Sequence, residues 1–322
     1  METSQRYRLF AELEVRGFSP CYEAWSCGIG DSPRLLGLID QLPESKRQPN
    51  LVFGAARYVG AVESGFAEFE EFLVGHWGEV REVAMTHRTQ TNEVGRTATL
   101  LPVLNLYPAQ PVALIEFGAS AGLCLYPDRY SYRYDDRPIL DPVGGRSEVV
   151  LSCNTSGHPP LPEALPQVAY RAGVDLNPLD LADDENLRWL ECLVWPEQRD
   201  RLARLRSAAA IVRRDPPELV AGDLVDTIAD LVHAVPQDIP VIVFGSAVLT
   251  YLPPERRAAF QAVMRTLPCR WITNEGTAVL DFGSATLPPV PTGIRMITAL
   301  DGDPVAYAAP HGQTLEWFGS AR

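Results

Sequence analysis

Lysine is almost missing from this sequence. Lys46 is the only one, so all the other basic residues among the 28 lysines and arginines are arginines. A phosphate-binding P-loop requires Gly-Lys-Ser/Thr, and the neighbours of Lys46, Ser45 and Arg47, do not fit that pattern. A Schiff-base mechanism needs a lysine amine and could use only this residue. The composition therefore argues against P-loop nucleotide hydrolysis and leaves little room for Schiff-base catalysis.

Cysteine and histidine are also sparse, and neither forms a recognisable metal-binding pattern. The six cysteines contain no Cys-x-x-Cys pair, which is typical of reduced thiols in a cytoplasm and not of a disulfide framework. The five histidines form no His-x-x-x-His or His-Glu-x-x-His motif, so we expect no metal site. These histidines are His76, His87, His158, His233 and His311.

Long apolar runs are absent as well. Residues 1–8 lack the apolar core of a signal peptide, and the run 239–249 is far shorter than the ~20 residues of a membrane-spanning helix. We therefore expect a cytoplasmic protein with no membrane partner. The formal net charge of −13 argues against a nucleic-acid partner, because proteins that grip phosphate backbones carry a basic surface.

The length of 322 residues predicts about two domains. Residues 1–108 show helical spacing of apolar residues and no alternating strand pattern. Ser19-Pro20 is a typical helix start, a second helix is expected from Asn50 with Gly65 past its end, and a third over 92–106. We expect residues 1–108 to form a helical domain that acts as a lid or substrate domain.

From residue 111 onward, short apolar runs alternate with amphipathic stretches, which predicts a mostly parallel sheet covered by helices on both faces. The expected strands are 112–117, 168–174, 218–221, 241–244 and 270–273. Runs 295–300 and 305–308 flank an Asp-Gly turn and predict a terminal antiparallel hairpin. Segment 128–166 is an expected insertion, with a strand around Tyr130–Tyr134. The fold class is therefore α/β, with a Rossmann-like domain over 109–322.

The strongest local signal is Val112-Ala-Leu-Ile-Glu116-Phe-Gly118-Ala-Ser120-Ala-Gly122, a buried strand that runs into a glycine-bearing turn. A dinucleotide-binding turn would need glycine where Ser120 stands. The same segment matches the Gly-x-Ser-x-Gly nucleophile turn of a serine hydrolase. It also matches the acidic-x-Gly-x-x-x-Gly turn by which methyltransferases hold S-adenosylmethionine (SAM).

The position of the turn favours the cofactor over the hydrolase. A hydrolase turn follows several strands, whereas this one follows the first expected strand. The downstream acid and histidine that a hydrolase needs would be Asp301 or Asp303 with His311, in or beside the terminal hairpin. In the cofactor interpretation, the glycines let backbone N–H groups approach the carboxylate end of SAM.

Later strand ends supply the polar groups that a nucleoside needs. Asp175 follows the second expected strand and could accept from ribose hydroxyls, and Asp223 follows the third and could accept from an adenine amino group. Gly245 and Ser246 end the fourth. Simpler structural roles exist: Glu116 could pair with an arginine, Asp175 could shape a turn, and Asp223 could cap the next helix.

Residues 111–318 resemble a class I SAM-dependent methyltransferase. More closely, most of the chain resembles an uncharacterised bacterial family whose members share blocks including Lys46-Arg-Gln-Pro-Asn50, Thr91-Asn-Glu-Val-Gly-Arg96, Asp175-Leu-Asn-Pro-Leu-Asp180 and Trp195-Pro-Glu197. The resemblance implies SAM as cofactor, S-adenosylhomocysteine as product and a small or medium substrate. It also implies a histidine after the fourth strand, where this chain has Gly245.

These arguments yield a set of predicted site residues. The predicted cofactor contacts are Glu116, Gly118, Ala119, Ser120, Gly122, Asp175, Leu176, Asp223, Leu224, Gly245 and Ser246. The predicted substrate contacts are Asn92, Arg96 and Asn274, and the candidate bases are Glu93, Tyr251 and Glu275. A helix cap at Asn92 and a Glu93–Arg96 ion pair are the simpler roles for that segment. The alternatives to a methyltransferase are a non-catalytic SAM- or nucleoside-binding protein and a serine hydrolase that uses Ser120.

Overall fold

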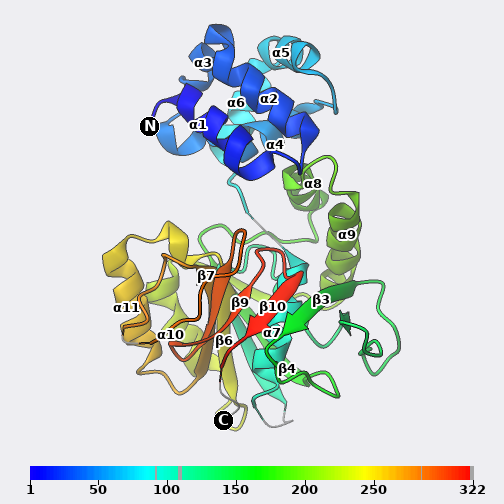
Figure 1. Cartoon of the computed structure of the whole chain (residues 1–322), viewed down its shortest axis with the longest axis vertical. Coiled ribbons are helices and arrows are strands. Elements are labelled where there is room, and N and C mark those ends of the chain that lie inside the picture. Colours follow the sequence, from blue (N-terminus) through cyan, green and yellow to red (C-terminus); the bar gives the residue numbers. More distant parts are fainter. Residues whose placement is uncertain (91–92, 108–110, 284, 320–322) are drawn as a thin grey trace. The chain divides into compact units, whose positions relative to one another are not determined.

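The computed structural model describes residues 1–90, 93–107, 111–283 and 285–319. Its internal contacts divide the chain into two compact units (Figure 1). One, the helical unit, comprises residues 1–91 and 182–203, and the other, the sheet unit, comprises residues 92–181 and 204–322. The predicted boundary at residue 108 therefore differs from this division, and residues 182–203 lie with the N-terminal helices.

The helical unit is built from short helices around an aromatic core. Ser19 caps α2 by accepting from the Tyr22 N–H at 3.2 Å, as its position before Pro20 predicts. The predicted helix from Asn50 ends earlier than expected, at Val59, because Gly60 takes the positive φ of 131° that terminates it. The helices are α1 (Thr3–Phe10), α2 (Pro20–Asp31), α3 (Pro33–Ile39), α4 (Pro49–Val59), α5 (Phe66–Gly75), α6 (Trp77–Thr86) and α8 (Asp184–Leu193), with a π-helical turn at Ala11–Val15 and a 3-10 turn at Glu44–Lys46.

Two tryptophans explain why residues 182–203 belong to the helical unit. Trp189 is fully buried and donates from Nε1 to the Arg88 carbonyl at 3.0 Å. Trp195 donates from Nε1 to the Asn50 side chain at 3.0 Å. Burial of apolar ring surface contributes roughly several kcal/mol, which offsets the entropy cost of bringing together two segments that are distant in the sequence. The sequence pattern alone places these residues in an α/β alternation and does not show where they pack.

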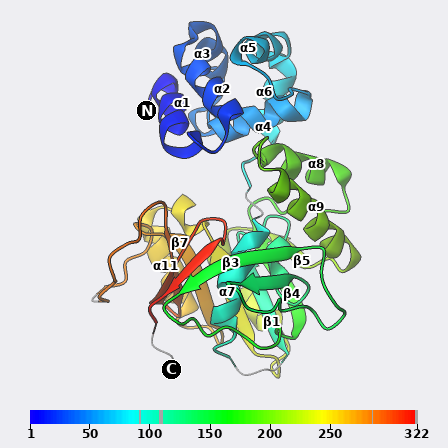
Figure 2. The same cartoon turned by 45° about the vertical axis from the view of Figure 1, so that its right-hand side comes forward.

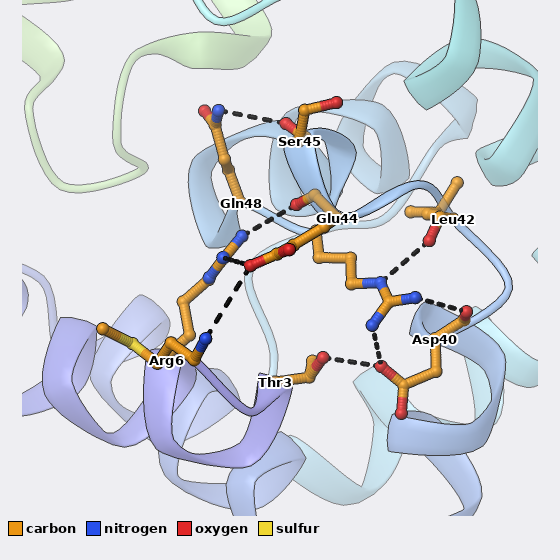
Figure 3. Close-up of polar contacts among 9 residues, drawn as sticks. Thr3, Arg6, Asp40, Leu42, Glu44, Ser45 and Gln48 are labelled. Atoms are coloured by element: carbon orange, nitrogen blue, oxygen red, sulfur yellow. Dashed lines mark hydrogen bonds and ion pairs between the residues drawn. The ribbon is translucent and has the colours of Figure 1, made fainter.

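Arginine side chains hold the segment between α3 and α4 in place (Figure 3). Arg47 donates to the Asp40 carboxylate at 2.8 Å and to the Leu42 carbonyl at 2.8 Å. Arg6 of α1 donates to the Glu44 carbonyl at 2.9 Å. Lys46, the single lysine, donates to the His87 carbonyl at 2.5 Å. These contacts give Lys46 a structural position in the helical unit.

The sheet unit contains a ten-stranded sheet in the order β2-β3-β10-β9-β8-β7-β6-β1-β4-β5 (Figures 1 and 2). Strands β5, β4, β1, β6 and β7 are parallel neighbours, and β8 and β9 continue the sheet as an antiparallel pair. The predicted α/β class, with a mostly parallel sheet and a C-terminal antiparallel segment, is confirmed. The strands are β1 (Val112–Phe117), β2 (Ser131–Tyr134), β3 (Val150–Ser156), β4 (Val168–Asp175), β5 (Glu218–Ala221), β6 (Val241–Ser246), β7 (Arg270–Gly276), β8 (Met296–Leu300), β9 (Asp303–Ala308) and β10 (Thr314–Trp317).

The insertion extends the sheet at its far edge. Its first strand, β2, confirms the strand expected around Tyr130–Tyr134, but β3 and β10 were not predicted. The last strand, β10, pairs antiparallel with β9 and parallel with β3, so the insertion and the C-terminal hairpin share one sheet (Figure 2). In β3 the exposed and buried side chains alternate along a polar sequence, which hides the strand from a search for apolar runs.

The two faces of the sheet around β1 differ in character. Phe117 and Ile115 pack with α10 (Leu224–Ala234) and α11 (Pro254–Met264) in an apolar core. Glu116 points to the opposite face, because successive side chains of a strand alternate. That face is covered by α7 (Thr97–Leu104), which follows a 3-10 turn at Val94–Arg96. A carboxylate is thus buried between the sheet and α7.

Candidate functional site

The glycine-bearing turn after β1 has the left-handed backbone that its sequence predicts. Gly118 and Gly122 have φ of 68° and 70°, and Ser120 between them has φ of 51°. The turn's N–H groups, however, are bonded within the protein. Gly118 and Ala119 donate to the Val174 carbonyl at 2.8 and 3.2 Å, and Ser120 donates to the Asp175 carboxylate at 2.9 Å. The sequence predicted that these N–H groups would donate to a cofactor carboxylate. In the structure they donate to protein oxygens instead.

The glycines of this turn make room for protein neighbours. A Cβ added at Gly118 would lie 2.3 Å from Val248 Cγ2, in the loop after β6. A Cβ at Gly245 would lie 2.3 Å from the Phe117 ring. The structure therefore has no room for the histidine that the family resemblance implies at position 245. Glycine is required at both positions by close packing at the carboxyl ends of β1 and β6.

The three predicted acids lie at the carboxyl ends of three adjacent strands: Glu116 is the penultimate residue of β1, Asp175 is the last residue of β4, and Asp223 follows β5. Because β1, β4 and β5 are neighbours, Glu116, Asp175 and Asp223 share one edge of the sheet. The simpler structural roles are present too. Asp175 accepts from the Asn177 N–H at 2.8 Å, which shapes the turn after β4. Asp223 caps α10 by accepting from the Val225 N–H at 2.9 Å, and it pairs with Arg256.

The residues that follow these two acids differ in exposure. The Leu176 side chain is 63% exposed, which is unusual for leucine, whereas Leu224 is buried in the core beneath α10. An exposed apolar side chain directly after a carboxylate provides a surface on which the flat ring of a ligand can pack. Leu176 therefore remains a candidate ligand contact, and Leu224 has a structural role.

Glu116 faces a small cavity under α7. The volume open to the centre of a water molecule is about 20 Å³, enough for about one water. Glu116 Oε2 is buried without a hydrogen-bond partner among the residues that the structure describes. Burial raises the pKa of Glu116 well above its usual range, Asp175 adds to the rise, and Arg96 opposes it. The other polar side chains that line the cavity are Arg96, Thr97, Thr99, Cys124, Ser246, Asn274 and Thr298.

Arg96 lines the cavity and donates hydrogen bonds to main-chain oxygens. It donates from Nε to the Pro310 carbonyl at 2.8 Å and from Nη1 to the Ser246 carbonyl at 3.0 Å. Asn274 donates to Ser246 Oγ at 3.0 Å, which links the ends of β6 and β7. The predicted contacts Arg96, Ser246 and Asn274 are thus brought together with Glu116, while Asn92 lies outside the described residues.

The candidate bases take different positions. Glu275 accepts the N–H groups of Val248 and Leu249 at 2.8 and 2.9 Å, so it holds the loop after β6. Burial is the main cause of the raised pKa of Glu275. Tyr251 is on the surface, with 74% of its side chain exposed. Neither residue is among those lining the cavity.

Glu93, the third candidate base, contacts a histidine side chain. Its Oε2 lies 3.0 Å from His311 Nδ1, and its Oε1 accepts from the Gly95 N–H at 3.0 Å. The predicted ion pair with Arg96 is not among the contacts of the described residues, in which Glu93 lies 3.8 Å from Arg204 and Arg96 donates to main-chain carbonyls. The sequence carried no sign of the Glu93–His311 contact, since the two residues are 218 positions apart.

The acid–histidine pair that the serine-hydrolase alternative would need, Asp301 or Asp303 with His311, is not among the contacts of the described residues. Asp301 accepts from the Trp271 N–H at 2.9 Å and pairs with Arg270 at 2.6 Å, while His311 turns its Nδ1 to Glu93. Ser120 is only 3% exposed. Within the described ranges, no group of three or more histidine, cysteine or acidic side chains could hold a metal ion. In the same part of the chain, no helix is long and apolar enough to cross a membrane.

Comparison with known proteins gives a family but no activity. No curated protein matches the sequence. A family model described as uncharacterized protein conserved in bacteria, DUF2332, matches residues 4–317. Because this match covers nearly the whole chain, the protein belongs to that bacterial family.

Proposed function

We propose that this protein is a SAM-dependent methyltransferase that acts on a small or medium-sized molecule. The observation that carries the proposal is the placement of Glu116, Asp175 and Asp223 at the carboxyl ends of three adjacent parallel strands. The chain runs from β1 to β4 on one side and from β6 to β7 on the other, so the strand order reverses beside β1. Open α/β sheets bind ligands at the carboxyl ends of their strands, at such a reversal.

The side chains suit the nucleoside half of the cofactor. Each carboxylate oxygen of Asp175 accepts one N–H and has lone pairs left for ribose hydroxyls. The exposed Leu176 side chain can pack on a purine ring, and Asp223 can accept from the purine amino group. Hydrogen bonds of this kind fix orientation, while burial of the ring supplies affinity.

The ammonium group of the cofactor suits the cavity, which has room for about one water. Glu116 Oε2 is an acceptor without a partner in the described part of the chain, and an ammonium group is the donor that would satisfy it. Arg96, which lines the same cavity, supplies positive charge for a carboxylate. The turn's N–H groups are already bonded, so in this proposal side chains replace them.

The cofactor supplies a methyl group on a positively charged sulfur. The chain positions the cofactor. In this proposal Asp175 and Leu176 orient its nucleoside half, and Glu116 orients its ammonium group in a buried cavity from which bulk water is excluded. Because methyl transfer is an in-line displacement, alignment of the acceptor with the methyl group accounts for much of the rate.

Calorimetric titration with SAM and S-adenosylhomocysteine tests the proposal. We expect saturable binding of both, weakened about tenfold by Leu176→Glu, since loss of one apolar contact costs roughly 1–2 kcal/mol. Val143→Glu is the matched control, because Val143 is also an exposed apolar residue of the sheet unit and lies in the insertion. No heat from either ligand at millimolar concentration contradicts the proposal. Binding without methyl transfer to any acceptor supports the non-catalytic alternative.

A further inference from the structure

Glu93 and His311 form a buried carboxylate–imidazole pair that the proposed binding residues do not include. Only 2% of Glu93 is exposed, and about a third of the His311 side chain is. The 3.0 Å contact joins Glu93 Oε2 to His311 Nδ1. A carboxylate bonded to Nδ1 keeps the proton on that nitrogen and leaves the lone pair of Nε2 available.

The backbone around the pair is held on both sides. A Cβ at Gly95 would lie 2.3 Å from the His311 carbonyl oxygen, and a Cβ at Gly312 would lie 2.0 Å from the Gly95 carbonyl oxygen. Arg96 Nε donates to the Pro310 carbonyl at 2.8 Å. Two turns distant in the sequence are therefore in direct backbone contact, and this contact fixes the position from which the imidazole projects.

The pair is adjacent to the Glu116 cavity. Cys124, which lines the cavity, donates from Sγ to the Glu93 carbonyl at 3.5 Å. Arg96 lines the same cavity and follows Glu93 by three positions. Charged groups beside the pair include Arg204, 3.8 Å from Glu93, and Arg96, which donates from Nε to the carbonyl of Pro310, the residue before His311. Glu93 is thus linked through Cys124 and Arg96 to the cavity in which we place the cofactor's ammonium group.

We propose that His311 is the proton acceptor of this site and that Glu93 is the residue that positions it. This inference rests on the proposed function. A hydroxyl, thiol or protonated amine of the methyl acceptor gives its proton to His311 Nε2. The electron pair freed on the acceptor forms the bond to the methyl carbon. The electron pair of the broken carbon–sulfur bond stays on sulfur, whose positive charge is neutralised. The imidazolium is stabilised by Glu93 and later returns its proton to water.

The protonation state of His311 is measurable without a known substrate. Nitrogen-15 NMR of histidine-labelled full-length protein should show His311 with a proton on Nδ1 and none on Nε2. In Glu93→Gln we expect His311 to shift toward the Nε2–H form. His76 is the internal control, because its Nδ1 contacts the Phe72 carbonyl at 3.0 Å and it lies in the helical unit. A wild-type His311 that carries its neutral proton on Nε2 overturns the proposal.

Methyl transfer gives the second readout. The wild-type protein is incubated with methyl-labelled SAM, a panel of phenols, thiols, amines and carboxylic acids, and a small-molecule bacterial extract. We expect His311→Asn to lower transfer at least a hundredfold, the usual contribution of a general base, with SAM affinity within twofold of wild type. We expect Glu93→Gln to lower kcat with KM unchanged.

The outcomes separate the two claims. Transfer that survives His311→Asn, with SAM bound, overturns the role of His311 and leaves the proposed function in place. SAM binding with no transfer by the wild-type protein contradicts the methyltransferase proposal and the proton-accepting role with it. If His311→Asn lowers both the SAM affinity and the unfolding temperature, His311 has a structural role and the inference is overturned. His311→Gln, which keeps more of the side-chain volume, repeats this check.

Discussion

The Ser120 N–H donates to the Asp175 carboxylate at 2.9 Å, across the ends of the neighbouring strands β1 and β4. This bond joins the glycine-bearing turn to the acid that the sequence predicts for ribose recognition. The same carboxylate also accepts from the Asn177 N–H. Asp175 is therefore a structural residue of the turn as well as a candidate ligand contact.

Removal of this carboxylate should destabilise the sheet unit. Asp175→Ala leaves the N–H groups of Ser120 and Asn177 without their acceptor, which costs about 1–3 kcal/mol. Urea unfolding followed by circular dichroism measures the loss. Asp136→Ala is the control, because Asp136 is exposed in the same unit and its change should cost less than about 0.5 kcal/mol. Equal stabilities of the two variants would show that the Asp175 bonds contribute nothing.

Gly118 should be intolerant of any side chain, through its contact with Val248. In Gly118→Ala the positive φ and the 2.3 Å approach to Val248 together cost roughly 2–4 kcal/mol of unfolding free energy. Val248→Ala removes the atoms in the way, so the double variant should be more stable than the sum of the two single losses predicts. If the losses of unfolding free energy in the two single variants simply add in the double variant, there is no steric clash between residue 118 and Val248.

Glu116 should make the stability of the protein fall as pH rises. Its folded-state pKa is raised by burial, so the neutral carboxyl is favoured by folding. That contribution is complete below the unfolded pKa of about 4.3 and is lost as pH rises toward the folded value. Glu116→Gln does not titrate, so its advantage over wild type should grow between pH 5 and pH 8.

The control for this pH dependence is Glu148→Gln, at an exposed position of the sheet unit. Its stability relative to wild type should stay constant over the same range. Urea unfolding at several pH values measures both differences. A constant difference between Glu116→Gln and wild type would contradict a raised pKa at Glu116.

The sequence predicted the parallel strands β1, β4, β5, β6 and β7 because each contains a short apolar run. Strands β1 and β5 have the predicted bounds, and the Asp-Gly turn located the β8–β9 hairpin. It did not predict β3 and β10, whose polar residues alternate with buried ones. Periodicity is a weak signal for short strands at the far end of a sheet, since their pairing depends on distant partners.

The candidate site was predicted mainly from residues near the carboxyl ends of strands, together with Arg96. Glu116, Ser246 and Asn274 were expected there, and the strand order brings them to one cavity. The contact between Glu93 and His311 joins segments 218 positions apart, and no local pattern encodes it. The use of Val248 to fill the space over Gly118 is likewise a packing detail that one sequence does not reveal.

The most direct test of the account compares two ligands in wild type and Glu116→Gln by calorimetry. S-adenosylhomocysteine has an amino group for Glu116, and 5′-methylthioadenosine has the same nucleoside without it. We predict that Glu116→Gln weakens S-adenosylhomocysteine binding at least about tenfold, the loss of one charged hydrogen bond of roughly 1.5–3 kcal/mol, and leaves 5′-methylthioadenosine within twofold. An equal effect on both ligands, or no binding of either to the wild-type protein, would contradict the account.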